Sequence, residues 1–324
     1  NFESDGRDFW AKDPKGSIRT ADAEEAAQWV SFCNNPQDPL RTQYGISQPC
    51  RIPLWQIGNE TSYFGNVFGC DDRDKSLEMA ARKTIEFAKS MRAADPTIEL
   101  IGWGDSGWGP RMLELAGEHL QYIAFHHMFD PDRGAADSPL QGTEYRRDPA
   151  RTWEHLMQGA RVHNERIQRM REEVAGYSTP LALTECHFAL PGRNRCEVLS
   201  SWAAGVANAR MLNVHERHGD VLKIATLADF CGTRWQVNAV MIPVPDGQSF
   251  LMPVALVMRL YRYHTGTHAV DVVQMPGDLD VTASRAEDQV ILHVVNTNRT
   301  QSVSTTLSVD GCTIESGKVF QLAA

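Results

Sequence analysis

Acidic side chains follow two short apolar stretches that lie far apart in the sequence. Glu60 ends the segment WQIGNE at residues 55–60, and Glu185 follows Leu183 and Thr184. A pair of carboxyl groups can cleave a glycosidic bond, because one protonates the leaving oxygen while the other attacks the anomeric carbon or activates water. A separation of about 5–5.5 Å gives retention of configuration, and about 6.5–9.5 Å gives inversion. These two acids are the first candidates for catalytic groups.

Each acid also has a simpler structural explanation. A single Glu after a strand most often lies in solvent or accepts hydrogen bonds at a helix start. The context of Glu60 is more specific, since Gly58 frees the backbone and Asn59 places a hydrogen-bonding amide beside the acid. This context favours a functional role for Glu60 over the simpler explanation.

Histidine and cysteine residues close to these acids raise the question of a metal site. Neighbouring residues of a strand point to opposite faces, so His126 and His127 do not easily share an ion. The same alternation separates Cys186 from Glu185 and His187. The sequence therefore favours no metal site along these strands.

Two further histidines, His215 and His218, are three residues apart in an expected helix. A solvated helix face explains them best, because a zinc site would lack its other ligands. Neither a Gly-x-Gly-x-x-Gly nor a Walker A pattern occurs, so a nucleotide cofactor has no support. We expect a protein that needs neither metal nor cofactor.

Short apolar strands alternate with amphipathic helices over most of the chain. Strands are expected at 52–57, 98–103, 122–126, 181–184 and 221–227, and helices near 22–33, 77–91, 149–176, 197–218 and 251–264. Strands buried on both faces and linked by helices imply a parallel sheet, either doubly wound or closed into a barrel. In a barrel the carboxyl ends of the strands face the active site, so both acids would point into one mouth.

The pattern changes after Gly266. Alternating residues at 290–295, followed by turn residues at 296–298, indicate antiparallel strands. We therefore expect two domains, 1–266 and 267–324.

Composition excludes several classes of protein. The 324 residues carry a net charge of −9, which argues against a nucleic-acid partner. No apolar run reaches the roughly 18 residues that a bilayer span needs, so we expect no membrane partner. Seven cysteines without a CxxC pair, and no apolar signal segment after the first residue, indicate free thiols and a cytoplasmic protein.

The segment at 55–60 resembles the Trp-Glu-Ile-Gly-Asn-Glu signature of glycoside hydrolase family 51, the α-L-arabinofuranosidases. Further stretches are similar at 94–100, around His126, at 220–225 and at 260–264, so the resemblance covers most of the chain. It implies a (β/α)8 TIM-type barrel followed by a C-terminal antiparallel β-sandwich. It also implies a retaining, exo-acting glycosidase that releases arabinose from arabinose-containing oligo- or polysaccharides.

The resemblance also assigns roles to individual residues. Glu60 corresponds to the general acid/base and Glu185 to the nucleophile. Asn59 would bind the sugar 2-hydroxyl, and His126 would line the mouth of the site. Trp103 and His127 complete the expected substrate-binding set.

Two departures from the family pattern affect the sugar pocket. Cys186 stands where a Trp usually follows the nucleophile, and His127 replaces an aromatic residue. The alternatives are the same mechanism on a xyloside or a glucan, and a non-catalytic carbohydrate-binding remnant of the fold. Members of the family tend to form oligomers, so the resemblance also implies a possible homo-oligomer.

A third departure is length. In the family order, Asn1 and Phe2 would end strand three, and the five expected strands would be strands four to eight. We therefore expect a chain that is incomplete at both ends, holding the barrel from the end of strand three to strand eight.

Overall fold

The computed structural model describes residues 22–62, 72–131, 137–189, 197–233, 237–243 and 245–323. The chain forms two compact units, Asn1–His126 with Arg169–Thr184, and His127–Gln168 with Glu185–Ala324. We call these the first and the second unit. The expected strand end at residues 1–2 lies outside the described residues.

A parallel sheet supplies the frame of the expected barrel. Its strands are β1 (Leu54–Ile57), β2 (Glu99–Trp103), β3 (Tyr122–Phe129), β4 (Leu181–Phe188) and β5 (Leu222–Ala225), hydrogen-bonded in that order. Both β1 with β2 and β2 with β3 pair in parallel. All five strands overlap the expected ranges, but β3 and β4 run on to Phe129 and Phe188, so Glu185, which was expected to follow its strand, lies within β4. β3 and β4 pass from the first unit into the second, so each unit holds one part of them.

Four helices and one 3₁₀ turn lie wholly within the described part of the first unit. They are α1 (Ala23–Asn34), α2 (Pro39–Gln43), α3 (Arg73–Ala94), α4 (Gly109–Ala116) and the 3₁₀ turn η1 (Gly117–His119). Asp22 caps α1, as the sequence predicts, by accepting a hydrogen bond from Glu25 N at 2.8 Å. α3 packs against α1, α4 and β1. It ends at Ala94 because Pro96 follows and cannot continue a helix.

The second unit contains two long helices and a small extra sheet. Its helices are α5 (Pro149–Glu173), whose last residues from Arg169 belong to the first unit, α6 (Trp202–Arg217) and α7 (Pro253–Tyr263), with short 3₁₀ turns η2 (Glu144–Arg146) and η4 (Glu197–Ser200). Three short strands, β6 (Asp229–Gly232), β7 (Asn238–Met241) and β8 (Phe250–Leu251), form a separate sheet. The sequence pattern does not predict this sheet, because each strand has only two to four residues and no clear alternation.

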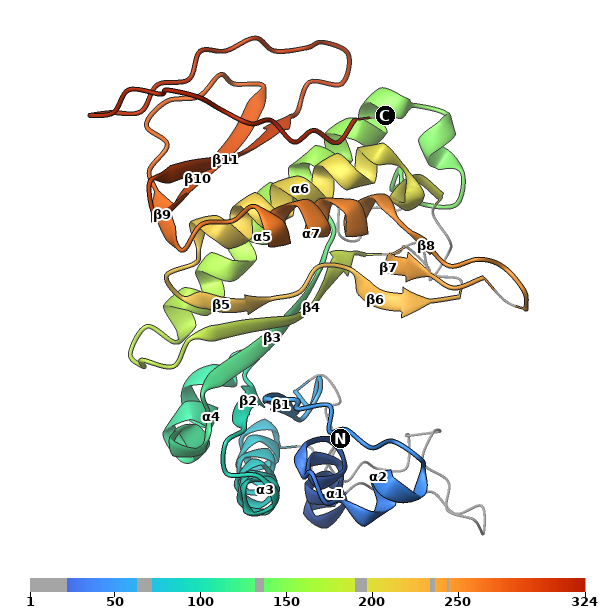
Figure 1. The fold of residues 1–324 in the computed structure, drawn as a ribbon, viewed down its shortest axis with the longest axis vertical. Coiled ribbons are helices and arrows are strands. Elements are labelled where there is room, and N and C mark those ends of the chain that lie inside the picture. The colour runs from blue at the N-terminus through green and yellow to red at the C-terminus, as the bar shows by residue number, and fades with distance from the viewer. Residues whose placement is uncertain are drawn as a thin grey trace. The chain divides into compact units, whose positions relative to one another are not determined.

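The C-terminal segment forms a three-stranded antiparallel sheet in the order β11-β10-β9. These strands are β9 (His268–Val270), β10 (Leu279–Ala286) and β11 (Gln289–Asn296), so the expected antiparallel strands are confirmed. β10 and β11 pack against α6, and α6 packs against α7 (Figure 1). The boundary at 266/267 stays a prediction.

Two features that were expected from composition, the state of the cysteines and the lack of a membrane span, can be compared with the structure. The described cysteines Cys33, Cys50, Cys186, Cys231 and Cys312 are free thiols. Among the described residues, no helix has both the length and the apolar composition that crossing a bilayer requires.

Candidate active site

Glu60 follows the carboxyl end of β1 in an unusual backbone conformation. Gly58 has a φ of 81° and Glu60 a φ of 53°, both in the left-handed region. Glycine adopts this region freely, but a residue with a Cβ is strained there. Such strain concentrates at functional sites, where the surrounding structure maintains it. The turn directs a half-buried carboxyl group away from the strand, while Asn59 beside it is exposed.

A histidine on β3 holds this carboxyl group. His126 Nδ1 lies 3.0 Å from Glu60 Oε1, and the His126 side chain is only 2% exposed. With Glu60 ionised, His126 Nδ1–H donates to the carboxylate. With Glu60 protonated, the carboxyl O–H can donate to the Nδ1 lone pair. The contact therefore suits both states of a group that gives and takes a proton.

Two further side chains fix the position of His126. The Trp103 ring meets the His126 ring edge-on, with 4.6 Å between centroids, and Trp103 Nε1–H donates to Ser62 Oγ at 2.8 Å. Asp105, which is buried, accepts a hydrogen bond from the backbone N–H of His126 at 3.1 Å. Asp105 is absent from the sequence predictions, although an acid two residues after a buried strand was a signal that could have found it.

Glu185 lies on β4 in the second unit, with its side chain 36% exposed. His187, two residues further on the same face, places Nε2 3.7 Å from Glu185 Oε1, and its Nδ1–H donates to the Phe188 carbonyl at 2.8 Å. Asp229, at the start of β6, joins this group, with one ligand atom of each residue within 4.8 Å of the others. Asp229 is also absent from the sequence predictions, because residues that follow β5 reach β4 only through the fold.

The charges in this group influence one another. Burial opposes the charged form of His187, but the Glu185 carboxylate, the Phe188 carbonyl and Asp229 outweigh it and raise the pKa of His187. Burial raises the pKa of Asp229, with His187 opposing and Glu185 adding to the rise. A histidine with a raised pKa carries its positive charge over a wider pH range, and this charge lies 3.7 Å from Glu185 Oε1.

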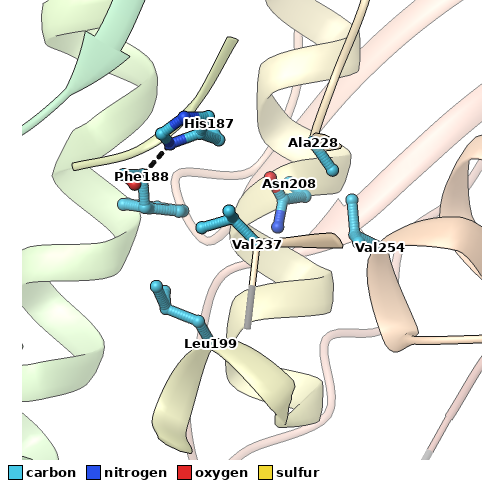
Figure 2. A pocket seen from close by; sticks show the side chains of 7 residues that line it. All are labelled: His187, Phe188, Leu199, Asn208, Ala228, Val237 and Val254. Carbon is cyan, nitrogen blue, oxygen red and sulfur yellow. Dashed lines mark hydrogen bonds between the residues drawn. The ribbon is translucent and has the colours of Figure 1, made fainter. Parts of the chain in front are cut away.

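A small cavity adjoins this group on its apolar side. Its lining combines His187 and Phe188 with Leu199, Asn208, Ala228, Val237 and Val254 (Figure 2). Its volume is about 10 Å³, which is room for one water molecule at most. The cavity is too small for a sugar ring, so it is not a sugar subsite.

His127 and Cys186 lie among helix residues of the second unit. His127 stacks on His163 of α5, with centroids 5.1 Å apart, and Cys186 is buried 3.9 Å from His163 Nε2. This placement argues against a direct role of His127 in sugar binding. It follows from the alternation of β3, which directs His126 to one face and His127 to the other.

The expected solvated helix face at His215 and His218 is wrong. Both side chains are buried, and His215 Nε2 lies 2.8 Å from His163 Nε2. Their spacing of three residues is compatible with either a buried or an exposed helix face, and the packing of α5 against that face decides between them.

Of the six predicted site residues, the first unit brings Glu60, His126 and Trp103 into contact, with Asn59 adjacent. In the second unit, Glu185 of β4 and His127 of β3 lie on opposite faces of the sheet that these two strands share. Glu60 follows the carboxyl end of β1 and Glu185 lies within β4, so each unit carries one acid on a strand of a parallel strand–helix fold.

Two family models match the chain, one in its N-terminal half and one in its C-terminal half. The model of the α-L-arabinofuranosidase 1 domain matches residues 12–147, and that of the α-L-arabinofuranosidase C-terminal domain matches residues 189–324. The chain belongs to the α-L-arabinofuranosidase family, glycoside hydrolase family 51.

Individual relatives agree with this assignment. An intracellular exo-α-(1→5)-L-arabinofuranosidase 1 of Bacillus subtilis is 30% identical over 122 residues, which are 34% of this chain and 23% of the relative. α-L-Arabinofuranosidase C of Emericella nidulans is 34% identical over 96 residues, covering 28% of this chain and 18% of the relative.

Solved structures show the same fold. The α-L-arabinofuranosidase of Thermotoga maritima in complex with arabinose has a TM-score of 0.63 at 22% identity, covering 86% of this chain and 60% of that chain. A family 44 xyloglucanase of Paenibacillus polymyxa has a TM-score of 0.52 at 14% identity, covering 83% and 57%. The predicted fold class, a TIM-type barrel with a C-terminal β domain, is confirmed. The chain spans less than two thirds of the length of each of these relatives.

Proposed function

We propose that this protein is a retaining, exo-acting α-L-arabinofuranosidase, with Glu60 as general acid/base and Glu185 as nucleophile. The observation that carries the proposal is the Glu60–His126 pair, an acid in a strained turn at a strand end, held by a buried imidazole. The family match over residues 12–147, which contains this pair, the second match over residues 189–324 and the name of the Bacillus subtilis relative support the choice of sugar.

The chemistry proceeds in two displacements. The Glu185 carboxylate attacks the anomeric carbon while the bond to the leaving oxygen breaks, and Glu60 gives its proton to that oxygen. Water then attacks the glycosyl ester, and Glu60 takes a proton from it as the bond to Glu185 breaks. Asn59, Trp103 and His126 would line the sugar subsite, because Asn59 precedes Glu60, His126 contacts it and Trp103 packs against His126.

A covalent trap tests the nucleophile directly. The protein is incubated with a fluorinated or cyclophellitol-type arabinofuranoside, and the intact mass and the labelled peptide are read. We expect one label per chain, on Glu185. A label on another residue would contradict the assignment. So would folded protein, verified by circular dichroism, that cleaves no aryl arabinofuranoside or that releases arabinose of inverted configuration.

The acid/base role predicts a specific pattern for Glu60→Gln. Loss of the proton donor lowers kcat by about 10²–10⁴-fold on substrates with poor leaving groups. The loss is smaller with an activated aryl leaving group, which needs no proton, and azide rescues Glu60→Ala. Glu118→Gln is the matched control, because the Glu118 side chain is 83% exposed. Equal losses on both kinds of substrate would contradict the role.

A second candidate is the same mechanism on a xyloside or a glucan. It stays open because a shared fold does not determine the sugar, as the likeness in fold to a xyloglucanase illustrates. A panel of aryl glycosides separates these substrates, since the highest kcat/KM identifies the sugar. Binding of arabino-oligosaccharides without turnover of any member of the panel would favour a non-catalytic remnant.

We further propose a carbohydrate as the partner and the cytoplasm as the location, because the Bacillus subtilis relative is named an intracellular enzyme. Cell fractionation checks the location. A homo-oligomer stays a prediction, and light scattering of the purified protein checks it.

A further inference from the structure

Three side chains of the types that can ligate metals lie close together in the second unit, on a face of β4 that the proposed reaction does not use. They are His163 of α5, Cys186 of β4 and His215 of α6, all three buried, with one ligand atom of each within 4.8 Å of the others. Each comes from a different element, so the cluster is a product of tertiary packing. We propose that these three side chains bind one borderline-soft transition-metal cation, Zn²⁺ or Cu⁺.

The donor types fit such a cation. Thiolate and imidazole together select zinc and copper over magnesium and calcium, which prefer oxygen ligands. No carboxylate belongs to this group, in contrast to the Glu185, His187 and Asp229 group on the other face of β4. The site is thus chemically distinct from the candidate active site.

The distances are close to those of a ligated ion. His163 Nε2 lies 2.8 Å from His215 Nε2 and 3.9 Å from Cys186 Sγ. Bonds of about 2.0–2.1 Å to nitrogen and 2.3 Å to sulfur in a tetrahedral arrangement require about 3.3 Å between nitrogens and about 3.6 Å from nitrogen to sulfur. Shifts of about half an ångström therefore accommodate the ion, which would replace the proton between the two Nε2 atoms.

A neighbouring histidine orients the central ligand. His127 Nδ1 lies 2.8 Å from His163 Nδ1, and the two rings are stacked with an angle of 9° between their planes. A metal-bound histidine typically donates its other N–H to a nearby acceptor, which fixes the ring and directs its lone pair at the ion. The contact with His127 supplies this interaction, so His163 Nε2 is free to ligate.

The protonation states of the two histidines and the cysteine determine how they can bind an ion. Burial and the neighbouring imidazoles hold the pKa of His163 well below its usual range, and burial with His218 lowers the pKa of His215 to about 4. Both rings are therefore neutral at pH 7, the form that ligates. Burial raises the pKa of the Cys186 thiol, so binding must release its proton to water as the metal–sulfur bond forms.

The net charge of the bound site differs between the two cations. One thiolate with Cu⁺ gives a neutral complex, whereas Zn²⁺ leaves a net positive charge in a buried site, which is costly. We therefore expect Cu⁺ to bind more tightly than Zn²⁺, with the same three ligands.

Metal titration of the reduced protein tests the proposal. Co²⁺ serves as the spectroscopic probe for the zinc arm, and competition with a chromophoric chelator measures Zn²⁺ and Cu⁺. We expect one ion per chain, a thiolate-to-cobalt charge-transfer band, and a rise in Tm on loading. Tighter Cu⁺ supports the neutral complex, whereas tighter Zn²⁺ would overturn the argument from charge.

Variants identify the ligands. Cys186→Ser and Cys186→Ala should lose the charge-transfer band and bind at least about 100-fold more weakly. His127→Phe, which keeps an aromatic ring but loses the nitrogen that contacts His163 Nδ1, should weaken binding by about 10–100-fold. Cys231→Ser is the matched control, because this thiol is exposed and should change nothing. Folded Cys186 variants that bind like the parent, or a folded parent that binds no ion, would overturn the proposal.

Discussion

Glu60 combines two features that seldom occur together by chance. Its backbone has a φ of 53°, at a cost of about 1–3 kcal/mol for a residue with a side chain. Its carboxyl group contacts a histidine that is itself held by the Asp105 carboxylate and the Trp103 ring. The turn and the histidine together pre-position the acid, so it loses little freedom when substrate arrives.

Removing the imidazole contact tests this positioning. In His126→Phe, the ring still packs against Trp103, but the hydrogen bond to Glu60 is lost. A hydrogen bond to a charged group contributes about 1.5–3 kcal/mol, so kcat should fall by about 10–100-fold with a small change in KM. Steady-state kinetics with an aryl arabinofuranoside measures both constants.

His126→Asn is the conservative partner of this variant, because its amide N–H can take the place of Nδ1–H. It should recover most of the lost kcat, and the pH profile of His126→Phe should differ in shape from that of the parent. A loss in His126→Asn equal to that in His126→Phe would point to a purely structural role for the ring.

β2 ends in a close approach to its neighbours. A Cβ at Gly104 would lie 2.4 Å from Ile123 Cγ1 and 3.1 Å from the Cα of Gly109, where α4 begins. The missing side chain lets the end of β2 pack against β3 and α4 at once. This packing sets the position of Trp103, and through it that of His126.

Gly104→Ala should therefore destabilise the fold. Overpacking of this kind costs about 1–3 kcal/mol, because Ile123 or the α4 backbone must shift. Urea denaturation followed by circular dichroism measures the free energy of unfolding. Gly176→Ala is the control, since a Cβ there meets nothing within 4 Å. Equal stability of the two variants would show that the end of β2 can relax freely.

Asp280 links distant parts of the chain within the second unit. This carboxylate of β10 is 6% exposed and contacts Arg210, Asn213 and Arg217 of α6, with a distance of 2.8 Å from Arg210 Nε. Burial opposes its charge, but these hydrogen bonds and the arginine charges outweigh burial and lower the pKa of Asp280. The ionised group therefore holds the C-terminal sheet on the helix.

The lowered pKa of Asp280 predicts how stability depends on pH. Its unfolded pKa is about 3.9, so its stabilising effect is fully present above about pH 4 and is lost as pH falls through the lower folded value. Asp280→Asn should lower the free energy of unfolding by about 3 kcal/mol at pH 7, because it leaves two arginines without their partner. The difference from the parent should shrink below about pH 4.

Denaturation at pH 7, 5 and 3 measures this effect. Asp246→Asn, at an exposed position, is the control and should match the parent at each pH. A deficit of Asp280→Asn that stays constant down to pH 3 would show that the charge of Asp280 is not the source of its contribution.

The sequence by itself determined the order of the strands and helices and the positions of the two acids. Apolar runs at 54–57 and 99–103 have the length of buried strands, and the spacing of α3 repeats every three to four residues, so local pattern defines both. Alternation along β3 also assigns His126 and His127 to opposite faces of the strand. These features depend on neighbours in the chain, which the sequence contains.

The tertiary structure alone decided what each face contacts. His215 and His218 are buried because α5 covers that side of α6, and Cys186 meets two histidines from helices whose packing no local pattern predicts. Asp229 reaches Glu185 across 44 residues of sequence for the same reason. Periodicity fixes the direction of a side chain relative to its own element, whereas long-range packing determines which element lies opposite.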